Sequence, residues 1–407
     1  MTSCQNPCCS SMQDACADCR ERSGVIHDSD ISELVEMLGS VPEFRKAKGM
    51  EYELKFILAV CVVGALAGGK NCRELATIAE MLPQPLLAKL GAEWGYFRNR
   101  YRYPRKTTIW FVLANVDAAE LDRIIGKWLL SQARKERQED GSFTWVFAID
   151  GKVMRGAWTD ENDKVTLFSA MIQGEGITIA QVRVPDGTNE ITQVKALVNI
   201  CDIAEGETVL ATLDAAHSNV ATGRLLGGKP GWDYLITVKT DKPSLYRKVA
   251  GKISPVLSDA PHDIMEESSR GRTKIWSCWV TDAGEIGYPH LEQVACICRE
   301  VYNRAGQKIS KDVALQITSA GPEQASAADI NRHTREHWGI ENKSHYVRDT
   351  LYREDHNESW KGNGPESIAA LHNLALGLLH LKKVKSIKET TEFIRMDRML
   401  ALTYMAT

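Results

Sequence analysis

The spacing of hydrophobic residues divides the chain into a helical first part and a mixed second part. Between residues 30 and 132, apolar side chains recur three and four positions apart, which is the period of a helix with one buried face. Four stretches show it: residues 31–41, 54–69, 72–82 and 119–130. A charged stretch poor in apolar residues follows at 133–142. We therefore predict an all-helical N-terminal domain at 30–132 and a solvated linker at 133–142.

After the linker the pattern changes to that of β-strands. Short runs rich in β-branched and aromatic residues predict strands at residues 144–150, 165–173, 177–184, 208–214 and 232–239. Helical patterns lie between the later strands, at 190–203 and 219–228. This order predicts an α/β fold with a mixed sheet flanked by helices. Strand-like runs return at about 240–318, which we interpret as a β-rich insertion, and helical patterns resume from residue 327.

The composition is that of a folded globular chain. Hydrophobic residues make up 43% and charged residues 25% of the 407 positions, which excludes a disordered or fibrous protein. The longest apolar run, residues 56–67, is too short to cross a bilayer, and no secretory signal is visible. We therefore expect a cytoplasmic protein with no membrane partner. Because the net charge is −3, binding to nucleic acid would require local basic patches.

The eleven cysteines fall into two groups. Six are scattered singly or in apolar runs and are typical of reduced core thiols: Cys61, Cys72, Cys201, Cys278, Cys296 and Cys298. The other five, Cys4, Cys8, Cys9, Cys16 and Cys19, lie in a leader at residues 1–29. That leader is either a disordered cysteine-rich segment or a zinc-binding module. We favour disorder, because the spacing is irregular and no apolar residues follow that would pack a small zinc module.

Three carboxylates are candidates for a metal site. Asp150 and Asp214 each follow an apolar predicted strand, and functional groups collect at the carboxyl ends of strands in open α/β sheets. Each is also compatible with an ordinary strand-ending turn. The third, Glu341, lies in residues 331–352, where helical spacing would place His337, Glu341, His345 and Arg348 on one face. The same pattern fits a solvated helix face with ion pairs.

Several short motifs occur in a recognisable order: IDGKVMRG, GTNEI, LDAAHSN, YLITVKTDKPSL, RGR, HWGIEN, HYVRD and EDHN. In this order they resemble DDE transposases of bacterial insertion sequences, in the ISAs branch that includes the H-repeat-associated proteins. The resemblance extends over about residues 31–402. It implies a ribonuclease H-like catalytic domain at 143–402, preceded at 30–132 by the helical domain associated with these transposases, a candidate for DNA binding.

The resemblance also implies chemistry. Asp150, Asp214 and Glu341 would be the catalytic carboxylates and would hold two Mg²⁺ ions, for which Mn²⁺ could substitute. The protein would cut and join the ends of an insertion sequence. Its partners would be the terminal inverted repeats and the target DNA, which it would bind as a homodimer, associating with the bacterial nucleoid. The alternatives are a catalytically silent DNA-binding remnant of such an element and, less favoured, a zinc-binding interaction protein.

The third carboxylate has competitors, and its surroundings depart from those of related transposases. Those relatives carry Tyr, Arg, Glu and Lys at positions where this chain has Thr334, His337, Glu341 and Arg348. Four nearby acids could replace Glu341: Glu336, Asp349, Glu354 and Asp355. We prefer Glu341, because Glu336 would project from another side of the helix and the last two acids follow its expected end.

Basic residues near aromatic ones are candidates for DNA contacts. Residues 96–108 hold five cations interleaved with aromatic side chains and no acid: Arg98, Arg100, Arg102, Arg105 and Lys106. This segment could instead be a basic solvated loop. Five more candidates lie near the predicted carboxylates or strand ends: Lys152, Arg155, Lys239, His337 and Arg348. Lys382, Lys383, Lys385 and Lys388 could be only a cation cluster at a helix C-terminus.

Overall fold

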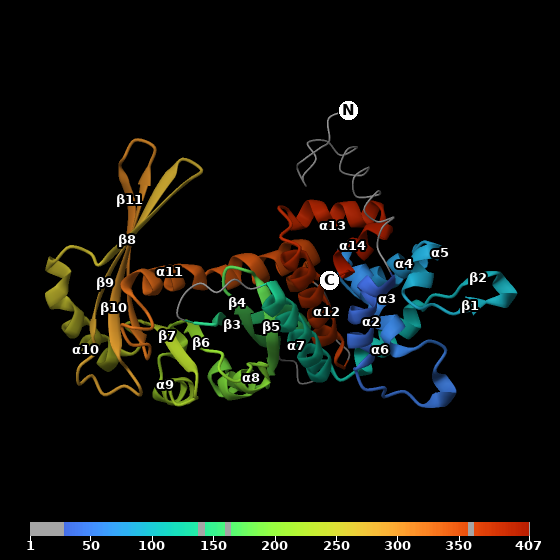
Figure 1. Ribbon diagram of the computed structural model, residues 1–407, viewed down its shortest axis with the longest axis horizontal. Coiled ribbons are helices and arrows are strands. Elements are labelled where there is room, and N and C mark those ends of the chain that lie inside the picture. The colour runs from blue at the N-terminus through green and yellow to red at the C-terminus, as the bar shows by residue number, and fades with distance from the viewer. Residues whose placement is uncertain (1–27, 137–142, 159–163, 357–361, 407) are drawn as a thin grey trace.

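The fold is a nine-stranded mixed sheet with a helical region at one end (Figure 1). The computed structural model describes residues 28–136, 143–158, 164–356 and 362–406. The strand order is β5-β4-β3-β6-β7-β11-β10-β9-β8. The predicted ribonuclease H-like mixed sheet, flanked by helices and preceded by a helical region, is confirmed.

The N-terminal region is built from six helices: α2 (Asp28–Gly39), α3 (Leu54–Leu66), α4 (Cys72–Glu80), α5 (Gln84–Lys89), α6 (Lys106–Asn115) and α7 (Ala118–Glu136). Twelve of the thirteen residues of α3 are buried, so this helix is covered on every side. One departure from the helical prediction is a short hairpin, β1 (Trp94–Gly95) and β2 (Arg100–Tyr101). Another is that the predicted linker begins as the last turn of α7; its residues 137–142 lie outside the described residues.

The first five strands of the sheet are β3 (Trp145–Trp158), β4 (Lys164–Ile172), β5 (Ile177–Val184), β6 (Val209–Leu213) and β7 (Trp232–Val238). Strands β3, β6 and β7 are parallel to one another, while β4 pairs antiparallel with β3 and β5 pairs antiparallel with β4. Helices α8 (Val194–Ile200) and α9 (Val220–Gly227) connect the parallel strands. The prediction that the first strand ends at Asp150 is wrong, because β3 continues to Trp158 in its pairing with β4.

The predicted insertion extends the same sheet. It contains α10 (Pro243–Ile253) and four strands: β8 (Asp263–Ser269), β9 (Arg272–Asp282), β10 (Gln293–Asn303) and β11 (Lys308–Thr318). Strand β11 pairs antiparallel with β7, which joins the insertion to the catalytic sheet through backbone hydrogen bonds. The tips of the β8–β9 and β10–β11 hairpins project beyond the rest of the sheet (Figure 1).

The C-terminal part returns to helices: α11 (Ala327–His337), η6 (Glu341–His345), η7 (Arg348–Tyr352), η8 (Glu354–His356), α12 (Gly364–Leu381), α13 (Ile387–Met396), η9 (Arg398–Leu400) and α14 (Ala401–Met405). Segments η6 and η7 are π-helical. A capping box of Ser326 and Asp329 starts α11. Helix α12 is buried at seventeen of eighteen positions and packs on α3, α7 and β5. The N-terminal helices and the sheet therefore share one hydrophobic core.

Two sequence expectations concern thiols and membranes. Cys61, Cys278, Cys296 and Cys298 are buried free thiols, and Cys72 and Cys201 are half-buried free thiols, as predicted. The five cysteines of the leader, with the choice between disorder and zinc, lie outside the described residues. Within the described ranges, no helix has both the length and the apolar character needed to span a membrane.

Candidate metal centre

Two aspartates lie side by side at the centre of the sheet. Ile149 on β3 is the parallel partner of Leu213 on β6, so the next residues, Asp150 and Asp214, are neighbours at the point where β6 ends. Asp214 caps the short helix that follows, accepting a hydrogen bond of 3.0 Å from the Ala216 N–H. Asp214 therefore does act as a strand-ending turn residue, and this role uses one oxygen of its carboxylate. The negative charge of Asp214 also contributes to a raised pKa of Asp150.

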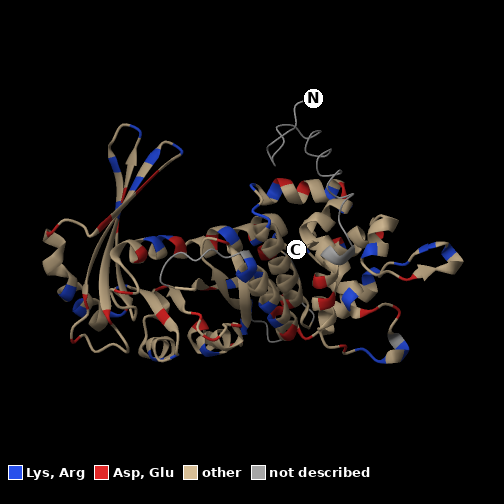
Figure 2. Cartoon of the chain, viewed as in Figure 1, with Lys and Arg blue, Asp and Glu red and all other residues tan. Residues whose placement is uncertain are grey.

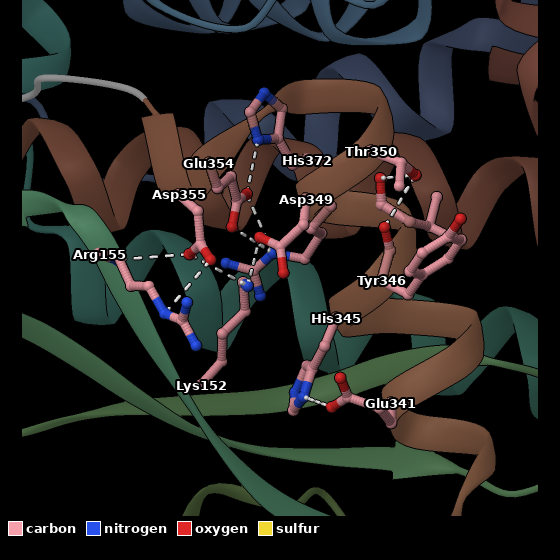
Figure 3. Close-up of polar contacts among 12 residues, drawn as sticks. Lys152, Arg155, Glu341, His345, Tyr346, Asp349, Thr350, Glu354, Asp355 and His372 are labelled. Carbon is pink, nitrogen blue, oxygen red and sulfur yellow. Dashed lines mark hydrogen bonds and ion pairs between the residues drawn. The ribbon is translucent and has the colours of Figure 1, made fainter.

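Glu341 and His345 reach Asp150 from η6. The Tyr346 N–H donates to the Glu341 carbonyl, which closes the wide i→i+5 turn of a π-helix. His345 Nδ1 lies 3.1 Å from Glu341 Oε2 and 3.8 Å from Asp150 Oδ2. One ligand atom from each of these three residues lies within 4.8 Å of the other two. Figure 3 shows His345 and Glu341 paired on their helix, below the ion pairs that Lys152 makes with neighbouring acids.

The electrostatics of these groups fit a divalent cation. Burial raises the pKa of Asp150 to about 6, partly offset by the nearby His345. The hydrogen bond from His345 holds the pKa of Glu341 below its ordinary value. His345 is only 3% exposed, and its Nε2 has no hydrogen-bond partner among the described residues. The two carboxylates and the Nδ1 of His345 that faces them are a donor set of the kind that divalent metals bind.

Glu190, in the GTNEI motif, is a fourth acid at this site, and the sequence analysis assigned it no role. A Cβ atom on Gly151 would collide with the Glu190 carboxylate, so any larger residue beside Asp150 would displace that carboxylate. Glu190 Oε2 lies 3.9 Å from Nε2 of the buried His217. The charge of Glu190 also raises the pKa of Asp150. The signal in the sequence was Gly151 itself, because a glycine inside a strand often marks close approach of another group.

The predicted helix face of His337, Glu341, His345 and Arg348 is only half correct. Glu341 and His345 stay together, but an i→i+5 turn holds more residues than an α-turn, so the four-and-three spacing no longer keeps one face. The Arg348 side chain is fully buried and pairs with Glu354 at 2.8 Å, so it is not on the surface, and its contact with DNA stays a prediction. His337 Nδ1 bonds to Thr212 Oγ1 at 2.9 Å. Burial lowers the pKa of His337 to about 4, which leaves it neutral at pH 7.

Lys152 is also buried instead of presented to solvent. Its side chain is 5% exposed, with Nζ 2.5 Å from Asp349 Oδ1 and 3.8 Å from Asp355 Oδ1. The charge of Lys152 is thus already paired with acids, and its contact with DNA stays a prediction. The pairing ties β3 to the segment that follows η6 (Figure 3). Arg155 keeps 75% of its side chain exposed while approaching Asp355 at 3.6 Å.

The competing acids have other partners. Asp349 and Asp355 bind Lys152, Glu354 binds Arg348, and Glu336 approaches Arg335 at 3.9 Å. Of the acids in this segment, Glu341 is the one that joins Asp150 in a group of three potential metal ligands within 4.8 Å of one another in the described part of the chain. The arrangement favours Glu341 over its four competitors.

The remaining DNA-contact candidates lie on the surface. Lys239 is exposed at the end of β7, and Arg98, Arg100, Arg105 and Lys106 are exposed around the β1–β2 hairpin. Arg102 differs from them, because it pairs with Glu51 and, at 3.3 Å, with Glu93. These residues stay predictions, with Arg102 partly neutralised by its acidic partners.

Comparison with known proteins agrees with this geometry. A family model described as "Transposase DDE domain" matches residues 141–378, and one described as "DDE_Tnp_1-associated" matches residues 35–129. The protein named "Putative transposase YncI" of Escherichia coli O157:H7 is 25% identical over 371 residues, covering 88% of this chain and 89% of the relative. "H repeat-associated putative transposase YhhI" of E. coli K12 is 23% identical over 368 residues, covering 87% and 92%.

A solved structure was also matched, the cryo-EM structure of the piggyBac transposase synaptic complex with hairpin DNA. Its TM-score is 0.36 at 12% identity, with 96% of this chain and 80% of that chain covered, a likeness too low to support a conclusion. The family model over residues 141–378 covers more than half of the chain. The chain therefore belongs to the transposase DDE family, with the associated helical region preceding its catalytic domain.

Proposed function

We propose that this protein is a DNA transposase that cuts and joins the ends of an insertion sequence with divalent metal ions. The observation that carries the proposal is the meeting of Asp150 and Glu341, 191 positions apart in the sequence, next to Asp214 and within a transposase DDE chain. Carboxylates collected on rigid strands are the ligands that Mg²⁺ and Mn²⁺ prefer.

Asp150, Asp214 and Glu341 would hold the ions, two in number by analogy with the family. Such ions, when bound, activate a water or a DNA 3′-hydroxyl for attack on a phosphodiester and stabilise the leaving oxygen. The chain's own part is to position the ligands. Asp150 is fixed in a central strand, and the His345 Nδ1 contact of 3.1 Å orients the Glu341 carboxylate. The Lys152 pairs with Asp349 and Asp355 hold η7 and η8 against β3.

The β1–β2 hairpin is the surface we propose for gripping DNA outside the metal centre. It projects at the end of the molecule opposite the insertion and carries basic residues, Arg98 and Arg100 (Figure 2). Tyr96 and Phe97 at its turn are 87% and 108% exposed, which suits stacking on bases better than a role in packing. Arg98 and Arg100, both exposed, supply charge for the phosphate backbone. The homodimer on DNA remains part of this proposal.

The test is Mg²⁺-dependent cleavage of a labelled duplex that carries the end of the element. Asp150→Asn, Asp214→Asn and Glu341→Gln should each reduce cleavage by at least 100-fold while duplex binding persists, because each removes ligand charge with little change in shape. Asp241→Asn and Glu285→Gln neutralise exposed acids elsewhere and serve as matched controls. Normal cleavage by Glu341→Gln, together with no cleavage by Asp355→Asn, would move the third ligand to Asp355. Duplex binding by the unmodified protein without cleavage would favour a catalytically silent remnant.

A further inference from the structure

A large basic cleft lies apart from the metal centre. Its volume is about 1320 Å³, and its lining includes eight Lys or Arg residues but only two Glu. The excess of six positive charges contrasts with a whole chain of net charge −3. Positive charge is therefore concentrated here against the overall balance. The cations that the argument uses are Arg270, Lys343, Arg353, Lys383, Lys385 and Lys388.

Three distant parts of the chain form the cleft. Lys343 and Arg353 come from the segment of η6 and η7, Arg270 from the tip of the β8–β9 hairpin, and Lys383, Lys385 and Lys388 from the end of α12 and the start of α13. In Figure 1 the hairpin and α13 rise on either side of the helical segment that follows α11, and Figure 2 shows basic residues on all three. Three of the four lysines that the sequence analysis described as a possible helix C-terminal cluster thus belong to a shared surface.

The backbone gives a second, independent observation. Arg270, Arg353 and Lys383 adopt φ angles of +48°, +53° and +50°. Only five described residues other than glycine have positive φ, and three of them are cations of this cleft. Glycine would occupy this left-handed region with less strain. Long basic side chains are thus present at positions where they cost stability, and such outliers gather where a ligand is held.

Four cations of this cleft are also available to a ligand. Arg270, Arg353, Lys385 and Lys388 are exposed. Within the described ranges, no acidic side chain lies within 4.0 Å of their charged groups. Lys343 donates to the Gly174 carbonyl, which neutralises no charge. The volume exceeds that of ordinary small-molecule pockets, and the charges are spread over three walls, which suits an extended polyanion.

We propose that this basic cleft binds duplex DNA through its phosphate backbone, as a surface separate from the catalytic face. Lys343 and Tyr346 line the cleft, whereas Glu341 and His345 of the same π-helical segment face Asp150. A duplex in the cleft would lie across the helix from the carboxylates, so it would be flanking or target DNA and not the phosphate being cut. The role as flank or target rests on the proposed transposase function; binding of a duplex does not.

The experiment measures duplex affinity of the full chain by fluorescence anisotropy as a function of salt. In Arg270→Gly/Arg353→Gly/Lys383→Gly we expect weaker binding, with the slope of log affinity against log salt reduced by about 0.9 for each phosphate that the protein no longer neutralises. The same variant should unfold at an equal or higher urea concentration, since glycine relieves the left-handed strain. The proposal therefore predicts that the glycine variant binds duplex DNA more weakly but is at least as stable as the unmodified protein.

Two matched variants complete the test. Lys385→Gln/Lys388→Gln leaves the strained positions alone and should also lower affinity and slope, which guards against a folding defect in the glycine variant. Lys195→Gln/Arg224→Gln, on α8 and α9, removes two exposed charges elsewhere and should change neither. Equal slopes for cleft and control variants would overturn the proposal. So would binding of labelled polyglutamate that depends on the cleft residues, together with no measurable binding of duplex.

Binding experiments with three duplex probes identify which DNA the cleft binds. A probe with the element end and a long flank, a probe trimmed to the end, and an unrelated duplex are compared. If the cleft variants lose affinity only for the probe with the long flank, the cleft binds flanking DNA. If they lose as much affinity for the unrelated duplex as for the other probes, the cleft binds target DNA. Asp150→Asn is included in each series. Because this variant should bind all three probes normally, the result for the cleft does not depend on cleavage. Absence of cleavage by the unmodified protein would count against the transposase function without changing that result.

Discussion

At the scale of single residues, His345 lies between the two carboxylates of the candidate metal centre, Asp150 and Glu341. Its Nδ1 lies within 4 Å of carboxylate oxygens of both Asp150 and Glu341, while its Nε2 is buried without a hydrogen-bond partner among the described residues. From the sequence it was only one of several potential cations on a helix. Its burial and its position between two acids depend on how η6 packs on β3, which no local pattern reveals.

His345→Gln tests this position. We expect Mn²⁺ affinity to fall by about 10- to 100-fold, as is usual when a group that orients or completes a metal site is removed. The measurement is calorimetric titration of the free protein, which needs no DNA. His356→Gln, an exposed histidine on η8, is the control and should bind as the unmodified protein does. Unchanged affinity in His345→Gln would exclude this residue from the site.

The burial of Asp122 predicts how the stability of the protein depends on pH. It is buried on α7, where burial raises its pKa to about 7 despite hydrogen bonds from the Gln181 backbone and Asn373 and the charge of Arg348, itself paired with Glu354. Because the folded-state pKa lies above the ordinary value of 3.8, Asp122 contributes stability below about pH 4 that is lost as pH rises through 7. Asp122→Asn stays neutral throughout.

We therefore expect Asp122→Asn to be more stable than the unmodified protein at pH 8, by about 1 to 3 kcal/mol, and little different near pH 4. Urea unfolding at several pH values measures the difference. Asp241→Asn replaces an exposed acid and should show no such trend. A constant difference between pH 4 and pH 8 would mean that Asp122 is charged in the folded protein at both.

Motif order gave Asp150, Asp214 and Glu341 as candidates, and the structure brings Asp150 and Glu341 together, but motif order did not give the contacts of their neighbours. Lys152 and Arg348 are cations close to predicted carboxylates, and a sequence alone makes both candidates for phosphate binding. The structure buries both in ion pairs with Asp349 and Glu354. Partner choice of this kind depends on tertiary packing, since Lys152 and Asp349 are 197 positions apart.

At the scale of elements, the period of apolar residues was a good guide wherever an element had an ordinary repeat. The strands at 144–150, 208–214 and 232–239 were predicted within a few residues of β3, β6 and β7, except for the extension of β3. The π-helical turns of η6 and η7 could not be predicted, because their side chains fit an α-helical pattern almost as well. That change of turn decides which side chains meet the metal centre.

The β1–β2 hairpin gives a prediction at this scale. Arg98→Ala/Arg100→Ala should weaken duplex binding and reduce the salt slope by up to about 1.8, since two phosphates would no longer be neutralised and each accounts for about 0.9. Arg102 is left in place because its pairs with Glu51 and Glu93 help to hold the hairpin. Arg123→Ala, on α7 and paired with Glu120, is the control. An unchanged salt slope would show that the hairpin is an ordinary basic loop that does not bind DNA phosphates.

At the scale of the whole molecule, the helical region and the catalytic sheet cannot be separated cleanly. Helix α12 packs on α3, α6 and α7 as well as on β5, and His372 on α12 approaches the Gly69 carbonyl at 3.0 Å. Without α12, several buried Leu and Val side chains of α3 would face water, each costing about 1.5 to 3 kcal/mol. A few such exposures equal the whole stability of a typical domain.

Residues 28–136 made alone should therefore fail to fold cooperatively. We expect broad, concentration-dependent unfolding by circular dichroism, whereas the full chain should show a sharp transition. Co-expression with a second fragment that contains residues 143–406 should restore a soluble complex, which serves as the control. A sharp, reversible transition in the isolated fragment would show that the N-terminal helices are an independent domain.

The burial of α3 against α12 has a consequence for synthesis on the ribosome. Helix α7 is complete at residue 136, but α12 starts only at residue 364, 228 positions later. At about 5 to 20 residues per second, α3 waits roughly ten to fifty seconds for the helix that covers it. During that interval a nascent chain with an apolar helix on every face is a client for chaperones that hold unfinished proteins. Translational pauses between β7 and α12 should therefore lower the yield of folded protein more than pauses before α3.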